Sequence, residues 1–171
     1  WNATPRINGL FKRSQVFTAL ALALSHGTND AQKTMGIITL ALVTGGYLAE
    51  FAVPVWVIVL CAGMIAAGTA LGGWKLIRTL GGKFYKIRPL DGFTSQLASA
   101  VVILSASVIG GPVSTTQVVS STIMGVGAAE RVNKVRWGVA KDIAMAWLLT
   151  IPATALVGAG AYWLITHLIP Q

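Results

Sequence analysis

Charged residues are scarce in this chain, and acids are scarcer than bases. Only 11% of the 171 residues are charged, with 13 Lys and Arg against 5 Asp and Glu. Soluble domains usually carry about 25% charged residues, so the composition argues against a soluble globular protein. Several apolar runs approach the roughly 20 residues that a membrane-spanning helix needs. The sequence therefore predicts an all-α, polytopic membrane protein with broken or re-entrant helices, embedded in a lipid bilayer.

Cysteine is almost absent: Cys61 is the single one and lies inside an apolar run. It cannot form an internal disulfide, and we expect it to pack as a small hydrophobic residue. The chain also lacks an initial Met and a secretory signal peptide, so we expect a fragment of a longer protein.

The basic residues gather in two segments between apolar runs, 75–89 and 130–141. They are Lys75, Arg78, Lys83, Lys86 and Arg88 in the first segment, and Arg131, Lys134, Arg136 and Lys141 in the second. Bases in short loops between membrane spans follow the positive-inside rule, so both segments are expected to be cytoplasmic loops. This explanation of the net charge of +8 leaves no reason to expect a nucleic-acid partner.

A polar stretch at residues 25–33 separates two apolar runs that are each too short to cross a bilayer. We expect a helix break here, with half-helices at 14–24 and 32–44. Ionisable groups at membrane depth are costly and usually mark a pathway or a binding site. Asn29 and Asp30 offer oxygens to a small cation, or a carboxylate to a proton, whereas Gln32 and Lys33 can donate to an anion. Lys33 could equally pair with Asp30 or reach toward the membrane surface.

A second break is expected at 110–112, where Gly-Gly-Pro interrupts an apolar region rich in hydroxyls. Since the flanking basic segments are both expected inside, the region 91–129 must enter the membrane and return. Pro112 can start a helix whose free N–H groups converge with the hydroxyls of Ser114 and Thr115, which would make segment 110–117 an oxyanion cradle. These hydroxyls could instead bond only backbone carbonyls one turn back. Further spans are expected at 55–80 and 142–169.

Ser25, His26 and Asp30 raise the alternative of an intramembrane hydrolase. Adjacent residues of a helix point about 100° apart, so Ser25 and His26 should diverge. The sequence also contains no G-x-S-x-G nucleophile motif. A hydrolase is therefore the weaker interpretation, and a helix-end hydrogen bond is the expected role of His26.

Two segments resemble signatures of the PiT inorganic phosphate transporters. Ser25 to Gly36 reads S-H-G-T-N-D-A-Q-K-T-M-G, where the family pattern is S-H-G-A-N-D-x-Q. Gly111 to Ser121 reads G-P-V-S-T-T-Q-V-V-S-S and is similar to the family's P-V-S-T-T-H segment. The likeness covers nearly the whole chain and aligns it with the C-terminal half of such a transporter.

The resemblance implies one half of an inverted-repeat symporter in the bacterial inner membrane, completed by an N-terminal half. Inorganic phosphate would lie between the halves, coupled to H⁺ or Na⁺ and carried with a divalent metal in some relatives. No resident cofactor or metal is expected, sulfate is an alternative substrate, and a homodimer is left open. The implied substrate-binding residues are Asn29, Asp30, Gln32, Lys33, Ser114, Thr115, Thr116 and Gln117, with Asn29 and Asp30 also at the coupling ion. Gln117 stands where His is usual and cannot titrate, so Asp30 is the better candidate for proton coupling.

Overall fold

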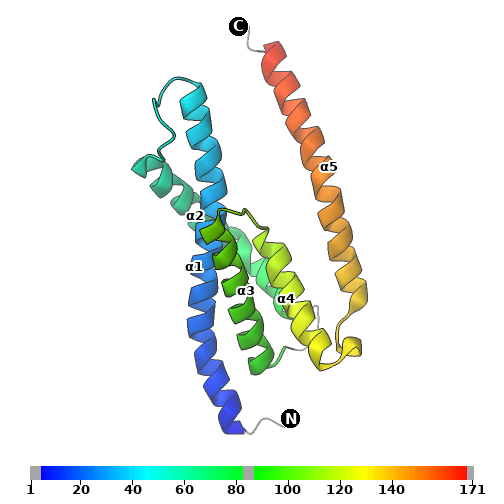
Figure 1. The fold of residues 1–171 in the computed structure, drawn as a ribbon. Helices are drawn as coiled ribbons and strands as arrows, with labels where there is room; N and C mark the ends of the chain where they lie inside the picture. Colours follow the sequence, from blue (N-terminus) through cyan, green and yellow to red (C-terminus); the bar gives the residue numbers. More distant parts are fainter. Residues whose placement is uncertain (1–4, 83–86, 169–171) are drawn as a thin grey trace. The chain divides into compact units, whose positions relative to one another are not determined.

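The structure is a computed structural model that describes residues 5–82 and 87–168. In this part of the chain every regular element is a helix (Figure 1). The elements are α1 (Pro5–Thr44), α2 (Val55–Gly82), α3 (Pro89–Ile109), α4 (Thr115–Glu130), the short 3₁₀ helix η1 (Val132–Lys134) and α5 (Trp137–Leu168). The chain divides into two compact units, Trp1–Val135 and Arg136–Gln171, so α5 is a unit by itself.

The distribution of apolar side chains is the reverse of that in a soluble protein. Large apolar residues are exposed on the helices, among them Phe17 (75%), Leu71 (89%) and Ile109 (84%). Three stretches of described helix, Val55–Trp74, Pro89–Ile109 and Trp137–His167, are long and apolar enough to cross a membrane. A protein surface of this kind needs apolar surroundings, so the predicted class of all-α membrane protein is confirmed.

The predicted helix break at 25–33 is wrong, because α1 continues through it without interruption. The hydroxyls of Ser25 and Thr28 donate to the carbonyls of Ala21 and Leu24, which satisfies them inside the helix. Gly27 costs only about 1 kcal/mol at a helix interior position. Asn29, Asp30 and Lys33 find partners on a neighbouring segment, so the backbone has no need to open. The two expected half-helices are therefore one helix of 40 residues.

The second predicted break is confirmed, and it is the turn of a helical hairpin formed by α3 and α4 (Figure 1). α3 ends at Ile109, and Gly110 follows with a φ of 80°, a left-handed conformation that favours glycine. α4 begins at Thr115 after Ser114, whose hydroxyl accepts from the Gln117 N–H at 3.4 Å. We call residues 110–114 the hairpin tip.

α3 lies alongside the first half of α1 and runs in the same direction (Figure 1). The Gln15 Nε2 donates to the Pro89 carbonyl at 2.7 Å, and further along the Thr18 hydroxyl donates to the Gln96 Oε1 at 2.6 Å. A Cβ at Gly92 would collide with the Gln15 Nε2, so a larger residue here would displace the end of the Gln15 side chain from its present position. Polar bonds between small residues are a usual means of joining helices in membranes.

The hairpin tip meets α1 within the helix and not at one of its ends. Asn29 lies 24 residues after Pro5 and 15 residues before Thr44, and its side chain bonds Val113 of the tip. At 1.5 Å per residue, α1 extends roughly 36 Å before this contact and roughly 22 Å beyond it. The hairpin therefore ends beside the interior of α1, as expected for a segment that enters and returns.

Two segments predicted to be loops are partly helical. Residues 75–82 belong to α2, because their residues are good helix formers up to Gly81-Gly82, and residues 83–86 lie outside the described part. In the segment 130–141, η1 occupies 132–134 and α5 begins at Trp137, where the Arg136 carbonyl accepts the first backbone bonds. The connection that remains in this segment is therefore shorter than predicted.

Candidate functional site

The amide of Asn29 holds the backbone of the hairpin tip. Its Nδ2 donates to the Val113 carbonyl at 2.9 Å, and its Oδ1 accepts from the Val113 N–H at 3.5 Å. Asn29 is only 2% exposed, so these bonds are shielded from solvent. The Asn29 side chain thus bonds both the N–H and the C=O of Val113, as a neighbouring β-strand residue would. This pair of bonds fixes the tip against α1.

Asp30 is surrounded by donors from both sides of the contact. On its own helix, His26 Nε2 lies 2.9 Å from Oδ2 and Lys33 Nζ lies 3.3 Å from Oδ1. From the N-terminus of α4, the Thr115 hydroxyl donates to Oδ2 at 3.3 Å. A carboxylate is favoured at this position because the first N–H groups of a helix carry partial positive charge.

A pocket of about 360 Å³ opens between α1 and the hairpin tip. Its lining consists of Asn29, Gln32, Lys33, Gly36 and Ile37 of α1 with Gly110 and Pro112 of the tip. The lining therefore combines an ammonium and two amides with glycines that expose backbone. This volume is within the usual range for small-molecule sites, and the donors suit a small oxyanion.

The structure brings together some of the predicted site residues and leaves others apart. Asn29, Asp30, Lys33 and Thr115 form one connected cluster, and Gln32 lines the pocket beside it. Ser114, Thr116 and Gln117 have exposed side chains at the start of α4, and Ser114 serves as the N-cap of that helix. They border the tip without joining the cluster. That any of these residues binds substrate stays a prediction.

Two groups of this cluster were not predicted as members. The Val113 carbonyl accepts from Asn29 and also from Lys33 Nζ at 2.5 Å, and no side-chain pattern could have identified a backbone acceptor. His26 was expected to bond a helix end, but α1 has no end there. The spacing of four residues between His26 and Asp30 was the available signal, because residues i and i+4 of a continuous helix share a face.

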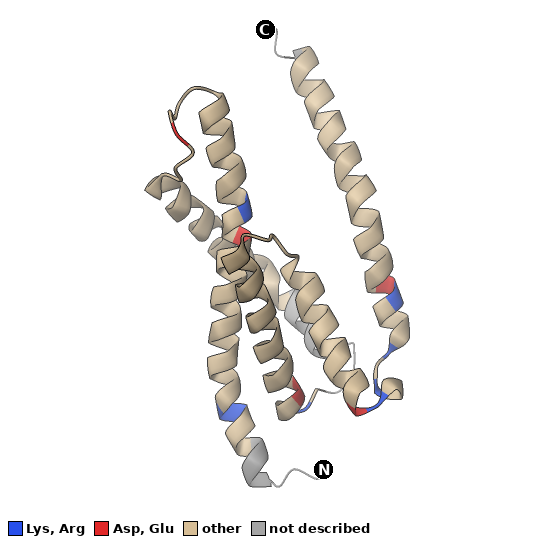
Figure 2. Ribbon diagram, viewed as in Figure 1, with Lys and Arg blue, Asp and Glu red and all other residues tan. Residues whose placement is uncertain are grey.

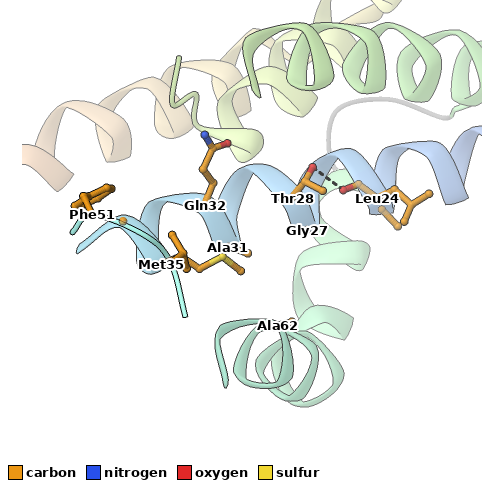
Figure 3. A pocket seen from close by; sticks show the side chains of 11 residues that line it. Leu24, Gly27, Thr28, Ala31, Gln32, Met35, Phe51 and Ala62 are labelled. Carbon is orange, nitrogen blue, oxygen red and sulfur yellow. Dashed lines mark hydrogen bonds between the residues drawn. The ribbon is translucent and has the colours of Figure 1, made fainter. Parts of the chain in front are cut away.

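A second, larger pocket of about 740 Å³ lies on another face of α1, against α2 and the connection between them (Figure 3). Ala31, Met35, Phe51 and Ala62 contribute to its mostly apolar lining. In Figure 3, Gln32 points away from Ala62 of α2. With no charged residue in its lining, this pocket suits hydrocarbon and not a small anion.

A different cluster of charges lies at the base of the hairpin, where α3 begins and α4 ends (Figure 2). Asp91 accepts from Lys134 Nζ at 3.0 Å and from the Arg88 N–H at 3.2 Å, and its carboxylate also lies 3.5 Å from the Arg88 guanidinium. Glu130 pairs with both Arg88 and Lys134. We call these four residues the base cluster.

Pairing in the base cluster stabilises the charged forms of its members. The hydrogen bond from Lys134, with the attraction of the Lys134 and Arg88 charges, lowers the pKa of the Glu130 carboxyl. The hydrogen bond to Asp91 and the Asp91 charge raise the pKa of Arg88 further. Two acids and two bases therefore neutralise one another where the hairpin begins and ends.

The geometry does not support a hydrolase site at 25–30. The Ser25 hydroxyl donates to the Ala21 carbonyl at 2.8 Å, whereas the His26 ring pairs with Asp30. Ser25 is 3% exposed and contributes to an apolar pocket against α3. Ser25 and His26 thus lie on different faces of α1 and have different partners, as expected for adjacent residues of a helix.

A helical membrane protein in which a hairpin tip meets charged residues inside another helix has the arrangement that membrane transporters use for their substrate sites. A family model described as the phosphate transporter family matches residues 2–158, and the chain belongs to this family. It is therefore a member of a transporter family and not of an enzyme family. The resemblance to phosphate transporters seen in the sequence is confirmed.

Relatives and a solved structure support the same assignment. The chain is 47% identical over 161 residues to a probable low-affinity inorganic phosphate transporter of Bacillus subtilis (94% of this chain, 48% of the relative). Its identity to the protein of the same description in Mycobacterium leprae is 49% (93% and 39%). A solved structure described as the sodium-dependent phosphate transporter matches with a TM-score of 0.84 at 31% identity (95% and 42%). The chain thus spans about half the length or less of these proteins.

Proposed function

We propose that this chain is one half, the C-terminal one, of an inorganic phosphate symporter, and that phosphate binds in the pocket between α1 and the hairpin tip. The observation that carries this proposal is the position of Lys33 and Gln32 opposite Gly110 and Pro112. A neutral amide with one ammonium can select an oxyanion and still release it. Family membership and the descriptions of the relatives support phosphate as the anion.

Asp30 is the proposed coupling group. It is the carboxylate nearest the pocket, and it lies between His26, Lys33 and the Thr115 hydroxyl. A small cation here would be attracted by the carboxylate, and a proton could reside on Asp30 or on His26 Nε2. The description of the related solved structure favours Na⁺, while the pairing of a histidine with an acid favours H⁺. We propose coupling to one of these two cations, with metal phosphate as a further form of the substrate.

The remainder of the site is proposed to come from the other half of the protein. The pocket is bounded by α1 and the hairpin tip, while apolar side chains of α1, α2 and α3 stay exposed. An inverted-repeat partner half would cover such surfaces and add its own donors to the anion. We propose that the base of the hairpin lies on the cytoplasmic side of a bacterial inner membrane, which the basic segments support. A homodimer of the complete transporter is compatible with this arrangement.

The test is uptake of labelled phosphate by the full-length protein in proteoliposomes. We expect saturable uptake that is driven by an imposed Na⁺ gradient or by an imposed pH gradient, and the responding gradient identifies the coupling cation. Unlabelled sulfate in tenfold excess over phosphate is the competitor. This excess offsets an affinity that is tenfold weaker, or roughly 1.4 kcal/mol in binding free energy. Absence of phosphate uptake together with uptake of labelled sulfate would replace phosphate with sulfate as the substrate, and uptake that does not saturate would indicate a channel.

A further inference from the structure

Lys33 has two partners at once, and they belong to different parts of the site. Its ammonium lies 3.3 Å from Asp30 Oδ1 and donates to the Val113 carbonyl of the hairpin tip at 2.5 Å. The same side chain lines the pocket and is 36% exposed. Lys33 therefore stands between the carboxylate on one side and the proposed anion site on the other.

The charges of this arrangement balance only while the pocket holds no anion. Asp30 and Lys33 together are neutral, and the other contacts of Asp30 come from His26, the Asn29 amide and the Thr115 hydroxyl. An oxyanion in the pocket would compete for the ammonium, since charged hydrogen bonds to phosphate are among the strongest available. Drawing Lys33 away would leave the Asp30 carboxylate without its internal cation, which is costly at membrane depth.

We propose that Lys33 is the internal counter-ion of Asp30 and that the transported cation takes its place when phosphate draws it into the pocket. This inference rests on the proposed function. Phosphate and the cation then bind cooperatively. Phosphate draws Lys33 away from Asp30, and the cation neutralises the carboxylate that Lys33 leaves. Lys33 would also release the Val113 carbonyl, so that Asn29 alone holds the tip in the loaded state. Lys33 is thus a positioning residue that links the two ligands.

The direct test is calorimetry of the full-length protein in detergent, titrating phosphate with and without Na⁺ at fixed pH, and at two pH values without Na⁺. In the unsubstituted protein the cation should strengthen phosphate binding by a factor in the typical coupling range of about 5 to 150. In Lys33→Gln the carboxylate lacks its internal cation in every state, so the cation should bind by itself. The coupling factor should then fall to about 1, and cation affinity without phosphate should rise.

Two further variants control for general effects. Lys12→Gln removes a positive charge from an exposed position of the same helix, roughly 31 Å away along its axis, and should keep the coupling factor. Lys33→Arg keeps the charge and should retain coupling above that of Lys33→Gln. If the unsubstituted protein binds no phosphate, the proposed function fails. If it binds phosphate in a cation-dependent way and Lys33→Gln has the same coupling factor, only the exchange by Lys33 is overturned.

A second measurement leaves Lys33 intact and so does not depend on the folding of a lysine variant. A cysteine at Gly111, where a Cβ would make an ordinary 3.6 Å contact, reports on the hairpin tip in a full-length background from which Cys61 and any further cysteine have been removed. Because Lys33 would leave Val113, maleimide should label Gly111→Cys faster when phosphate and cation are supplied together than with either alone. Equal rates in all three conditions would contradict the proposal.

Discussion

Charged residues lie at both ends of the α3–α4 hairpin, in the base cluster at one end and on α1 beside the tip at the other, and their surroundings differ. At the base, Asp91 and Glu130 share the same two cationic partners, Arg88 and Lys134. At the tip, one acid and one ammonium adjoin a pocket, and the ammonium is divided between the acid and a backbone carbonyl. A closed set of ion pairs fixes structure, whereas a charge with a choice of partners can respond to a ligand. The comparison predicts that substitutions at the tip impair transport and those at the base impair stability.

The largest effect should come from Asp30 of α1, which lies beside the hairpin tip. Asp30→Asn keeps the shape of the side chain and removes the charge that the coupling cation needs. We expect phosphate uptake by the full-length protein in proteoliposomes to be abolished, with little change in thermal unfolding in detergent. Glu50→Gln, an exposed acid in the connection after α1, is the matched control and should transport normally. Uptake near the unsubstituted rate in Asp30→Asn would remove Asp30 from the coupling role.

Asp91→Asn should have the opposite profile at the base. The Asp91 side chain is 5% exposed and is paired with two cations, so its loss removes buried charged hydrogen bonds and leaves Glu130 as the partner of both cations. We expect destabilisation of about 2 kcal/mol, measured by thermal or denaturant unfolding in detergent. Uptake per folded molecule should be retained. Asp142→Asn, at an exposed acid of α5, should change stability little, and an Asp91 variant that is stable but inactive would contradict the contrast.

A smaller effect on transport is expected from Thr115, the first residue of α4 after the hairpin tip. Its hydroxyl donates to Asp30 Oδ2, and Thr115→Val removes this donor without altering the shape of the side chain. We expect phosphate affinity measured by calorimetry to weaken roughly fivefold, which corresponds to about 1 kcal/mol for one hydrogen bond. Thr44→Val, at an exposed position where α1 ends, is the control. Unchanged affinity in the Thr115 variant would mean that this hydroxyl has only a structural role.

The smallest effect should be the pH dependence of the base cluster. Pairing lowers the pKa of Glu130 from its ordinary value of 4.5, so the carboxylate stabilises the folded state fully above that value. This contribution is lost as the pH falls below 4.5 and through the lowered pKa. The melting temperature should therefore drop less in acid for Glu130→Gln than for the unsubstituted protein. Equal drops would show that the exposed pairs of Glu130 contribute nothing measurable.

The sequence identified the elements whose causes are local. Gly110 and Pro112 ended one helix and preceded another because their backbone preferences act within a few residues. The same reasoning failed at residues 25–33, where the polar side chains led us to predict a helix break. Whether such side chains break a helix depends on the partners that another segment supplies, and here Val113 and Thr115 supply them.

What the sequence by itself determined is the class of protein, the position of the hairpin turn and the residue types at the site. Apolar runs, glycine and proline positions and the acid and base at 30 and 33 are all properties of short stretches. Only the tertiary structure decided that Asn29 holds the tip through the Val113 backbone and that Lys33 is shared between Asp30 and that same carbonyl. The two contacts with Val113 join residues that are 80 and 84 positions apart in the chain, so no local pattern could predict them.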